Sequence, residues 1–181
     1  MNDQNTPENL ERVGKSAYQN KQYQTAAENF QLAAGGYATS GEKLLAAEMQ
    51  NNASVAYLQA GNPEEAFEVV RGTETIFREA GDTRRQALAL GNIAAALEAL
   101  GRIEEAIAAY EESSELLKSI GEKEMRASVM QSLSALQLRS GKQLEALATM
   151  QAGIDGIEHP SLKERMLKKL LQVPFKLMNR S

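Results

Sequence analysis

The sequence repeats with a period of 40 residues, and this period restricts the possible folds more than any other feature. Glycine recurs at Gly41, Gly81 and Gly121, and Ser161 takes the fourth position. No insertion interrupts the period. Three further rows keep the same spacing: Gly61, Gly101 and Gly141 with Lys21; Ala26, Ala66, Ala106 and Ala146; and the small residues Gly14, Ser54, Ala94 and Ser134. Such a period predicts an array of stacked supersecondary units.

Each repeat contains the pattern of two helices. Residues 42–60, 82–100 and 122–140 have helical periodicity, with Leu90, Ile93, Leu97 and Leu100 at i, i+3, i+7 and i+10 in the third repeat. A second helix follows within residues 101–121. The glycine rows end these helices because glycine tolerates the left-handed conformation of a helix C-terminus. The rows of small residues mark places where two helices cross closely. The predicted fold class is therefore all-α.

The stretch GGYATSGEK, residues 35–43, has the G-x-x-x-x-G spacing of a phosphate-binding loop. The next residue is Glu42, where that motif needs lysine, and the preceding AAENFQLAAGG does not resemble a buried strand. We therefore interpret Gly41 as a turn glycine between two helical hairpins. Gly35 and Gly36 fall inside the preceding helix, where each costs about 1 kcal/mol relative to alanine, and we expect a local weakness there.

Over residues 7–160 these rows resemble the tetratricopeptide repeat family. The match is clearest in residues 87–113, where large, small, turn and aromatic positions of the family are occupied by Leu90, Ile93, Ala94, Leu97, Gly101, Ala106, Tyr110 and Ser113. The period is 40 residues and the usual repeat has 34. Gly81-Asp82 and Gly91-Asn92 are similar to the long-helix subclass found in kinesin light chains and spindle-orientation adaptors. HEAT and armadillo repeats have similar periods, but the GRIEEA and GNPEEA turns fit tetratricopeptide repeats better.

The resemblance implies a right-handed α-solenoid of four helical hairpins. We expect a disordered N-terminus at 1–6 and repeats at about 7–41, 42–81, 82–121 and 122–160. Ser161 and Glu164 then form a capping box before an apolar helical face, which contains Leu162, Met166, Leu167, Leu170 and Leu171. We expect residues 161–173 to be a C-terminal capping helix, since a solenoid needs its last core covered, and residues 174–181 to be a basic tail.

Few residues could support catalysis. The chain has no cysteine and a single histidine, His159, which excludes the usual zinc constellations. The Glu-Glu pairs at 64–65 and 104–105 follow turn glycines and open helices, where acids complement the helix dipole. We predict that the protein is not an enzyme and uses no cofactor or metal. The absence of cysteine, of a signal region and of an apolar membrane-spanning run fits a cytoplasmic protein.

Charge is distributed unevenly. Residues 1–160 carry 14 Lys+Arg against 23 Asp+Glu, a net charge of −9, and residues 161–181 carry a net charge of +5. The acidic body argues against nucleic-acid binding. The basic C-terminal segment could attach to an anionic membrane, but its apolar face is needed for capping, so membrane attachment is an alternative of lower rank.

The resemblance implies a non-enzymatic scaffold or adaptor whose first helices line a concave groove for a peptide or helix of a partner protein. The candidate groove residues by register are Arg12, Lys15, Asn52, Val55, Leu88, Asn92, Ala95, Ser132, Ala135 and Arg139. Asn52 and Asn92 rank first because an amide can pair with any peptide backbone, although an asparagine can also bond within its own superhelix. The carboxylate clamp of chaperone-binding relatives is incomplete, since Leu88 and Asn92 stand where it needs a lysine and an arginine. Self-association into a homo-oligomer is a further alternative.

Overall fold

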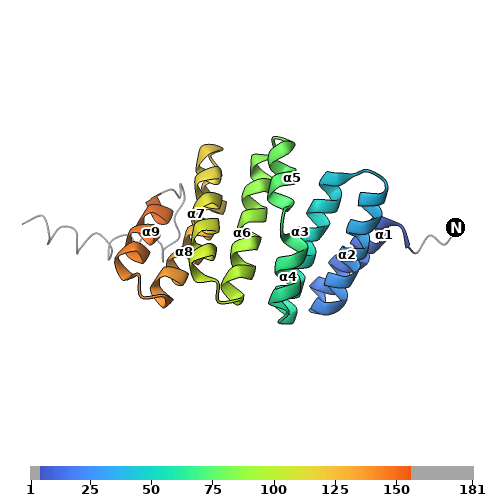
Figure 1. Cartoon of the computed structure of the whole chain (residues 1–181), viewed down its shortest axis with the longest axis horizontal. Helices are drawn as coiled ribbons and strands as arrows, with labels where there is room; N and C mark the ends of the chain where they lie inside the picture. Colours follow the sequence, from blue (N-terminus) through green and yellow to red (C-terminus); the bar gives the residue numbers. More distant parts are fainter. Residues whose placement is uncertain (1–4, 156–181) are drawn as a thin grey trace, which may run out of the picture. The chain divides into compact units, whose positions relative to one another are not determined.

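The structure, a computed structural model, describes residues 5–155, and these form helices joined by short turns, with no strand among them (Figure 1). The all-α repeat fold is confirmed. The predicted capping helix, the basic tail, His159 and most of the N-terminal segment lie outside the described residues. The helices are α1 (Pro7–Gln19), α2 (Tyr23–Thr39), α3 (Lys43–Ala60), α4 (Pro63–Val70), α5 (Thr73–Glu79), α6 (Thr83–Ala99), α7 (Ile103–Ser119), α8 (Lys123–Arg139) and α9 (Gln143–Asp155).

The turns repeat every 20 residues, at half the sequence period. At each one the backbone adopts a positive φ, and the next residue donates its N–H to a carbonyl five residues earlier, at 2.8–3.0 Å. These bonds satisfy carbonyls that a helix C-terminus would otherwise leave unpaired. The left-handed residues of these turns are Lys21, Gly41, Gly61, Gly81, Gly101, Gly121 and Gly141. Gly41 is therefore a turn residue, as predicted.

Lys21 is the exception in this series. Its φ is +60°, and among the described residues it is the one position with positive φ that is not glycine. Its neighbour Gln22 still donates to the carbonyl of Ala17 at 2.9 Å. The turn geometry is thus kept at a steric cost from the lysine Cβ.

The second helix of the second repeat is broken, which the sequence pattern did not predict. α4 ends at Val70 and α5 begins at Thr73, with Gly72 between them at φ +91° (Figure 1). The hydroxyl of Thr73 donates to the carbonyl of Val70 at 2.8 Å, so this buried side chain pairs a carbonyl at the break. The second helices of the first and third repeats, α2 and α7, each run for 17 residues without a break.

The chain forms two compact units, residues 1–109 and 110–181. In the first, α2 packs on α1 and α3, and α3 also packs on α4, α5 and α6; in the second, α8 packs on α9. The core of the first unit is rich in alanine, and many of these residues are completely buried. Small side chains let helix axes approach closely.

Two glycines are explained by close packing. A Cβ on Gly14 would lie 2.9 Å from ring carbons of Phe30, and one on Gly36 would lie 2.5 Å from Cγ of Pro7. The expectation that Gly36 is simply a weak point is therefore incomplete, because its missing side chain lets α2 pack against the start of α1. Gly35 has no atom within 4 Å of its Cβ position and serves no such contact.

Candidate functional site

The first compact unit contains a cavity of about 310 Å³ between three of its helices. α1 contributes Lys15, Tyr18 and Gln19, α2 contributes Phe30, and α3 contributes Asn52 and Val55. The side chains on α1 lie at i, i+3 and i+4, and those on α3 at i and i+3, so each helix presents one face to the cavity. Three of the predicted groove residues, Lys15, Asn52 and Val55, thus share one site.

The walls of the cavity are apolar and fixed by packing. Phe30 is 4% exposed, and Gly14 lies against its ring. Tyr18 makes an edge-to-face contact with Tyr23, with ring centroids 5.3 Å apart. Tyr18 is not among the predicted groove residues, although its position one turn after Lys15 on the same helix face indicates this role.

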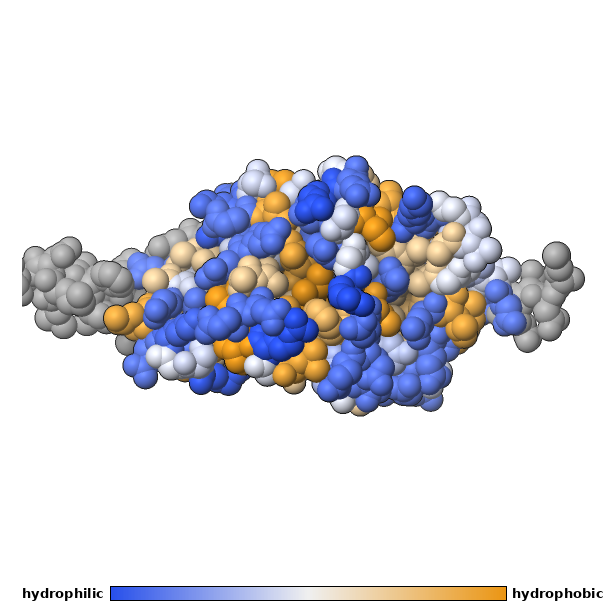
Figure 2. All heavy atoms as spheres, viewed as in Figure 1, coloured by the Kyte–Doolittle hydropathy of each residue, from blue (hydrophilic) through white to orange (hydrophobic). Residues whose placement is uncertain are grey.

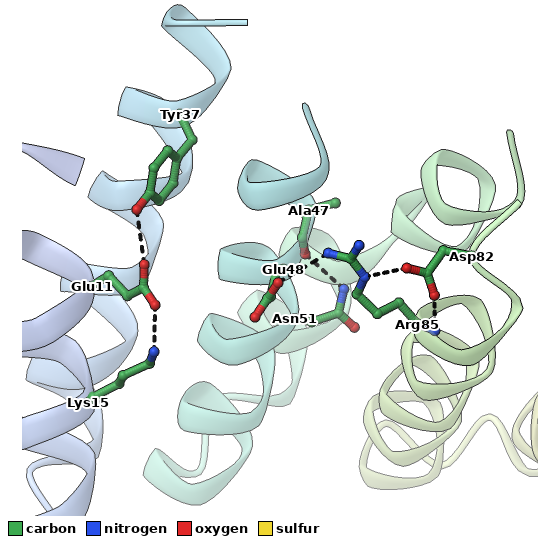
Figure 3. A network of polar contacts seen from close by, with 8 residues as sticks. All are labelled: Glu11, Lys15, Tyr37, Ala47, Glu48, Asn51, Asp82 and Arg85. Carbon is green, nitrogen blue, oxygen red and sulfur yellow. Dashed lines mark hydrogen bonds and ion pairs between the residues drawn. The ribbon is translucent and has the colours of Figure 1, made fainter. Parts of the chain in front are cut away.

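Lys15 brings a positive charge to the cavity and is held by Glu11 through an ion pair one turn away (Figure 3). The other carboxylate oxygen of Glu11 accepts a hydrogen bond of 3.0 Å from the buried Tyr37 hydroxyl. The bond from Lys15, aided by that from Tyr37, lowers the pKa of Glu11 although its burial opposes this. Burial, together with the Glu11 carboxylate, raises the pKa of Tyr37 to about 12.

Asn52 and its neighbour Asn51 have different surroundings. Asn51 is buried, and its amide nitrogen donates to the carbonyl of Ala47 at 2.9 Å and to the Thr73 hydroxyl at 3.0 Å. Its amide oxygen accepts a bond of 3.0 Å from the amide nitrogen of Asn92. Asn52 is half-buried at the cavity, and no residue of the described part hydrogen-bonds to its amide.

Arg85 of α6 forms a second polar cluster in the first unit (Figure 3). Its guanidinium pairs with Asp82 at 2.6 Å and with Glu48 of α3 at 3.2 Å, and it lies 5.2 Å from the centroid of the Phe77 ring. The backbone N–H of Arg85 bonds to Asp82 and is the main cause that lowers the pKa of this carboxyl. The pairing with Asp82 in turn raises the pKa of Arg85. Arg85 was not predicted from the sequence as a functional residue, and in the structure its ion pair with Glu48 links α6 to α3.

The remaining predicted groove residues do not line the cavity. Arg12 is exposed on α1 and donates to the side chain of Asn9 at 2.7 Å. Leu88 on α6 is 39% exposed, and Ala95 on the same helix is half-buried. The other three candidates belong to α8 in the second compact unit, where Ser132 and Arg139 are exposed and Ala135 is half-buried.

Two other kinds of site were sought in the part of the chain that the structure describes, a metal centre and a membrane-spanning helix. Residues 5–155 contain no group of three histidine, cysteine or acidic side chains placed to hold a metal ion. No helix among them is long and apolar enough to cross a membrane. On the face drawn in Figure 2 the surface is largely hydrophilic, with smaller apolar patches between the charged side chains.

The fold is therefore that of a helical repeat protein, and comparison with known proteins places it more closely. Residues 85–158 match the tetratricopeptide repeat family. Two solved structures of nearly identical TPR-like repeats, assigned to a kinesin light chain of Podosopora anserina, share the fold. One has a TM-score of 0.72 at 16% identity and covers 100% of both chains; a point variant of the same repeats has 0.68 at 16% identity, with 95% of each chain covered. No curated protein matches the sequence.

The predicted resemblance to tetratricopeptide repeats is thereby confirmed over residues 85–158, and the fold is shared with the repeats of the two solved structures. Repeats of this family generally mediate contacts between proteins, and their fold is typically a non-enzymatic scaffold.

Proposed function

We propose that this chain is a non-enzymatic adaptor of the cytoplasm that binds a segment of a partner protein at the α1–α3 cavity. The observation that carries the proposal is the combination of apolar walls with an amide and a cation in one open site. Tyr18, Phe30 and Val55 supply the walls, and Lys15 and Asn52 supply the polar groups.

The cavity suits one apolar anchor side chain of an extended or helical segment. Burying such a side chain contributes about 1.5–3 kcal/mol to binding. The Asn52 amide can donate to and accept from the backbone beside that anchor, whatever the neighbouring side chains are. Because no residue of the described part bonds to this amide, the pairing breaks no bond that the structure shows.

The rest of the partner extends beyond the cavity in this proposal. Leu88, Asn92 and Ala95 on α6 are the candidate contacts in the same compact unit. Asn92 already donates one hydrogen bond to Asn51, so it ranks below Asn52 as a recognition residue. Ser132, Ala135 and Arg139 on α8 remain candidate contacts in the second unit.

A display selection of random peptides on the full chain tests the proposal. Peptides that bind the wild type are measured again by calorimetry on the Val55→Glu variant, which places a carboxylate in the apolar wall. We expect about a tenfold or greater loss of affinity, because the anchor would have to desolvate that charge. The matched control is Leu32→Glu, since Leu32 is 61% exposed on α2 and does not line the cavity.

Circular dichroism establishes that both variants keep their helical content. Selected peptides that bind Val55→Glu as tightly as the wild type would exclude this cavity as the binding site. Selection that yields no peptide, together with a concentration-dependent dimer by light scattering, would replace the proposal with self-association.

A further inference from the structure

The charge at the α1–α3 cavity is already paired within the protein. Among the described residues that line the cavity, Lys15 is the one with a charge, and the others are neutral: Tyr18, Gln19, Phe30, Asn52 and Val55. Lys15 forms an ion pair with Glu11, one turn earlier on α1 (Figure 3). A ligand in the cavity therefore meets an ion pair at this place and not an isolated cation.

Glu11 is the more restrained partner of this pair, because a second helix holds it. Its side chain is 21% exposed, against 58% for Lys15. Its other carboxylate oxygen accepts a hydrogen bond of 3.0 Å from the hydroxyl of Tyr37 on α2, and this tyrosine is buried in the core. The bond from Lys15 lowers the pKa of Glu11, so the carboxyl is ionised at neutral pH. We therefore expect the Glu11 carboxylate to stay beside Lys15 when a ligand approaches.

The later repeats are uncharged at the two positions of this ion pair. The residues at these phases are Asn51 and Val55, Gly91 and Ala95, and Gln131 and Ala135. The first repeat thus carries a cation and an anion together where each later repeat carries neither. In all four repeats the formal charges at the two positions cancel or are absent.

We propose that the partner segment is uncharged where it contacts the cavity, and that Glu11 sets this specificity by holding Lys15. The inference deepens the proposed function and rests on it. An acidic side chain that approached the Lys15 ammonium would also approach the Glu11 carboxylate, and the repulsion would offset the attraction. A basic side chain meets the converse pair of effects. An apolar anchor between uncharged polar side chains avoids both.

The random-peptide selection, run on the wild type and on Glu11→Gln, tests this specificity. Wild-type peptides that Val55→Glu does not bind should show no enrichment of Asp or Glu beside the anchor relative to the starting library. Glu11→Gln leaves Lys15 without an anionic partner, so it should enrich acidic residues there about threefold or more. Glu28→Gln is the matched control and should select as the wild type does, because Glu28 is exposed on α2 and does not line the cavity.

Calorimetry with one pair of peptides gives the same test in quantitative form. The pair consists of a selected neutral peptide and its analogue with glutamate beside the anchor, and the wild type should bind both within about twofold. Glu11→Gln should bind the acidic analogue about fivefold more tightly than the neutral peptide, and Lys15→Gln about fivefold more weakly. The double variant Glu11→Gln/Lys15→Gln should show no preference, since both charges are gone. Circular dichroism checks that each variant keeps its helical content.

The outcomes separate this inference from the proposed function. Wild-type peptides that depend on Val55 but are rich in Asp or Glu would overturn the inference alone. The same conclusion would follow if Glu11→Gln weakened both peptides equally, because Glu11 would then have only a structural role. Peptides that bind Val55→Glu as tightly as the wild type, or a selection that yields none, would overturn the proposed function and this inference with it.

Discussion

The cavity at Asn52 and the hydrogen-bond network at Asn51 place neighbouring asparagines in opposite roles. Asn52 faces an open site, and no described residue bonds to its amide. Asn51 bonds to Ala47, Thr73 and Asn92 and is 8% exposed. Asn52 and Asn92 were both predicted groove residues, but Asn92 already bonds to Asn51. An amide at a predicted groove position can therefore be recognised by a ligand without loss only where no other side chain of the protein bonds to it.

The network also accounts for the break in the second repeat. Where α4 stops, the Thr73 hydroxyl pairs the carbonyl of Val70, and Asn51 donates to that same hydroxyl. The first repeat has no such break, and its α2 is continuous. The buried polar groups near Gly72 thus pair with one another where the helix is interrupted, whereas no residue of the described part bonds to the Asn52 amide at the cavity.

Removing the centre of the network should have the largest effect on stability. We expect Asn51→Ala to lower the free energy of unfolding by about 2–3 kcal/mol, because Thr73 and Asn92 lose their buried partner. Asn52→Ala is the matched control and should cost less than about 0.5 kcal/mol. Urea unfolding followed by circular dichroism measures both. Equal losses would contradict the contrast between the two asparagines.

A methyl group on Gly14 should disturb the cavity wall. Its Cβ would lie 2.9 Å from the ring of the buried Phe30, so Gly14→Ala should lower the free energy of unfolding by about 1–3 kcal/mol. It should also weaken binding of selected peptides, because Phe30 lines the cavity. In Gly35→Ala the Cβ meets open space, and helix propensity should raise stability by about 0.5–1 kcal/mol. A loss in Gly35→Ala similar to that in Gly14→Ala would contradict this packing.

A substitution of Lys21 should change the stability of the protein without altering a residue that lines the cavity. Replacing it with glycine should raise the free energy of unfolding by about 0.5–1 kcal/mol, since glycine adopts the +60° φ without steric cost. Thermal and urea unfolding of Lys21→Gly measure the gain. Gly41→Lys, at the next turn, should lose a similar amount. Affinity for selected peptides should stay unchanged in Lys21→Gly, and a changed affinity would link this turn to the site.

The ion pair between Glu11 and the cavity residue Lys15 depends on pH, whereas the hydrogen bonds of Asn51 involve no titratable side chain. The pKa of Glu11 is lowered in the folded protein, so its contribution to stability is fully present above its unfolded pKa and is lost as pH falls through the folded pKa. Because Lys15 is largely exposed, we expect Glu11→Gln to cost less than about 1 kcal/mol at pH 7.

Unfolding by urea at pH 7 and pH 3 measures this difference. The gap between wild type and Glu11→Gln should narrow at pH 3, and the gap for Asn51→Ala should not. A gap for Glu11→Gln that is independent of pH would show that the loss comes from geometry and not from charge.

Most of the helical framework could be predicted from the sequence, because glycine rows fix where the helices end. Residues 42–60, 82–100 and 122–140 were expected, and α3, α6 and α8 lie within one residue of those bounds. The break at Gly72 was not predicted, since it depends on Asn51 and Thr73, which meet only when α3 packs beside α5.

The candidate site was predicted in part. The family resemblance, carried over by position in the repeat, placed Lys15, Asn52 and Val55 on one predicted surface, and Asn52 and Val55 share a face because they lie one turn apart on α3. Register could not show that Asn92 bonds to Asn51, which lies 41 residues away in sequence. It also could not show that Gly36 contacts Pro7 from another helix. Both depend on distances between helices, which the period of the sequence does not specify.

The most direct test of the account compares Asn52→Ala with Asn92→Ala in the binding of one peptide selected on the wild type. Both variants remove an amide at the same phase of consecutive repeats. Calorimetry should show about a tenfold or greater loss of affinity for Asn52→Ala and less than about a twofold change for Asn92→Ala. Equal losses, or a larger loss for Asn92→Ala, would contradict the claim that the Asn52 cavity is the recognition site.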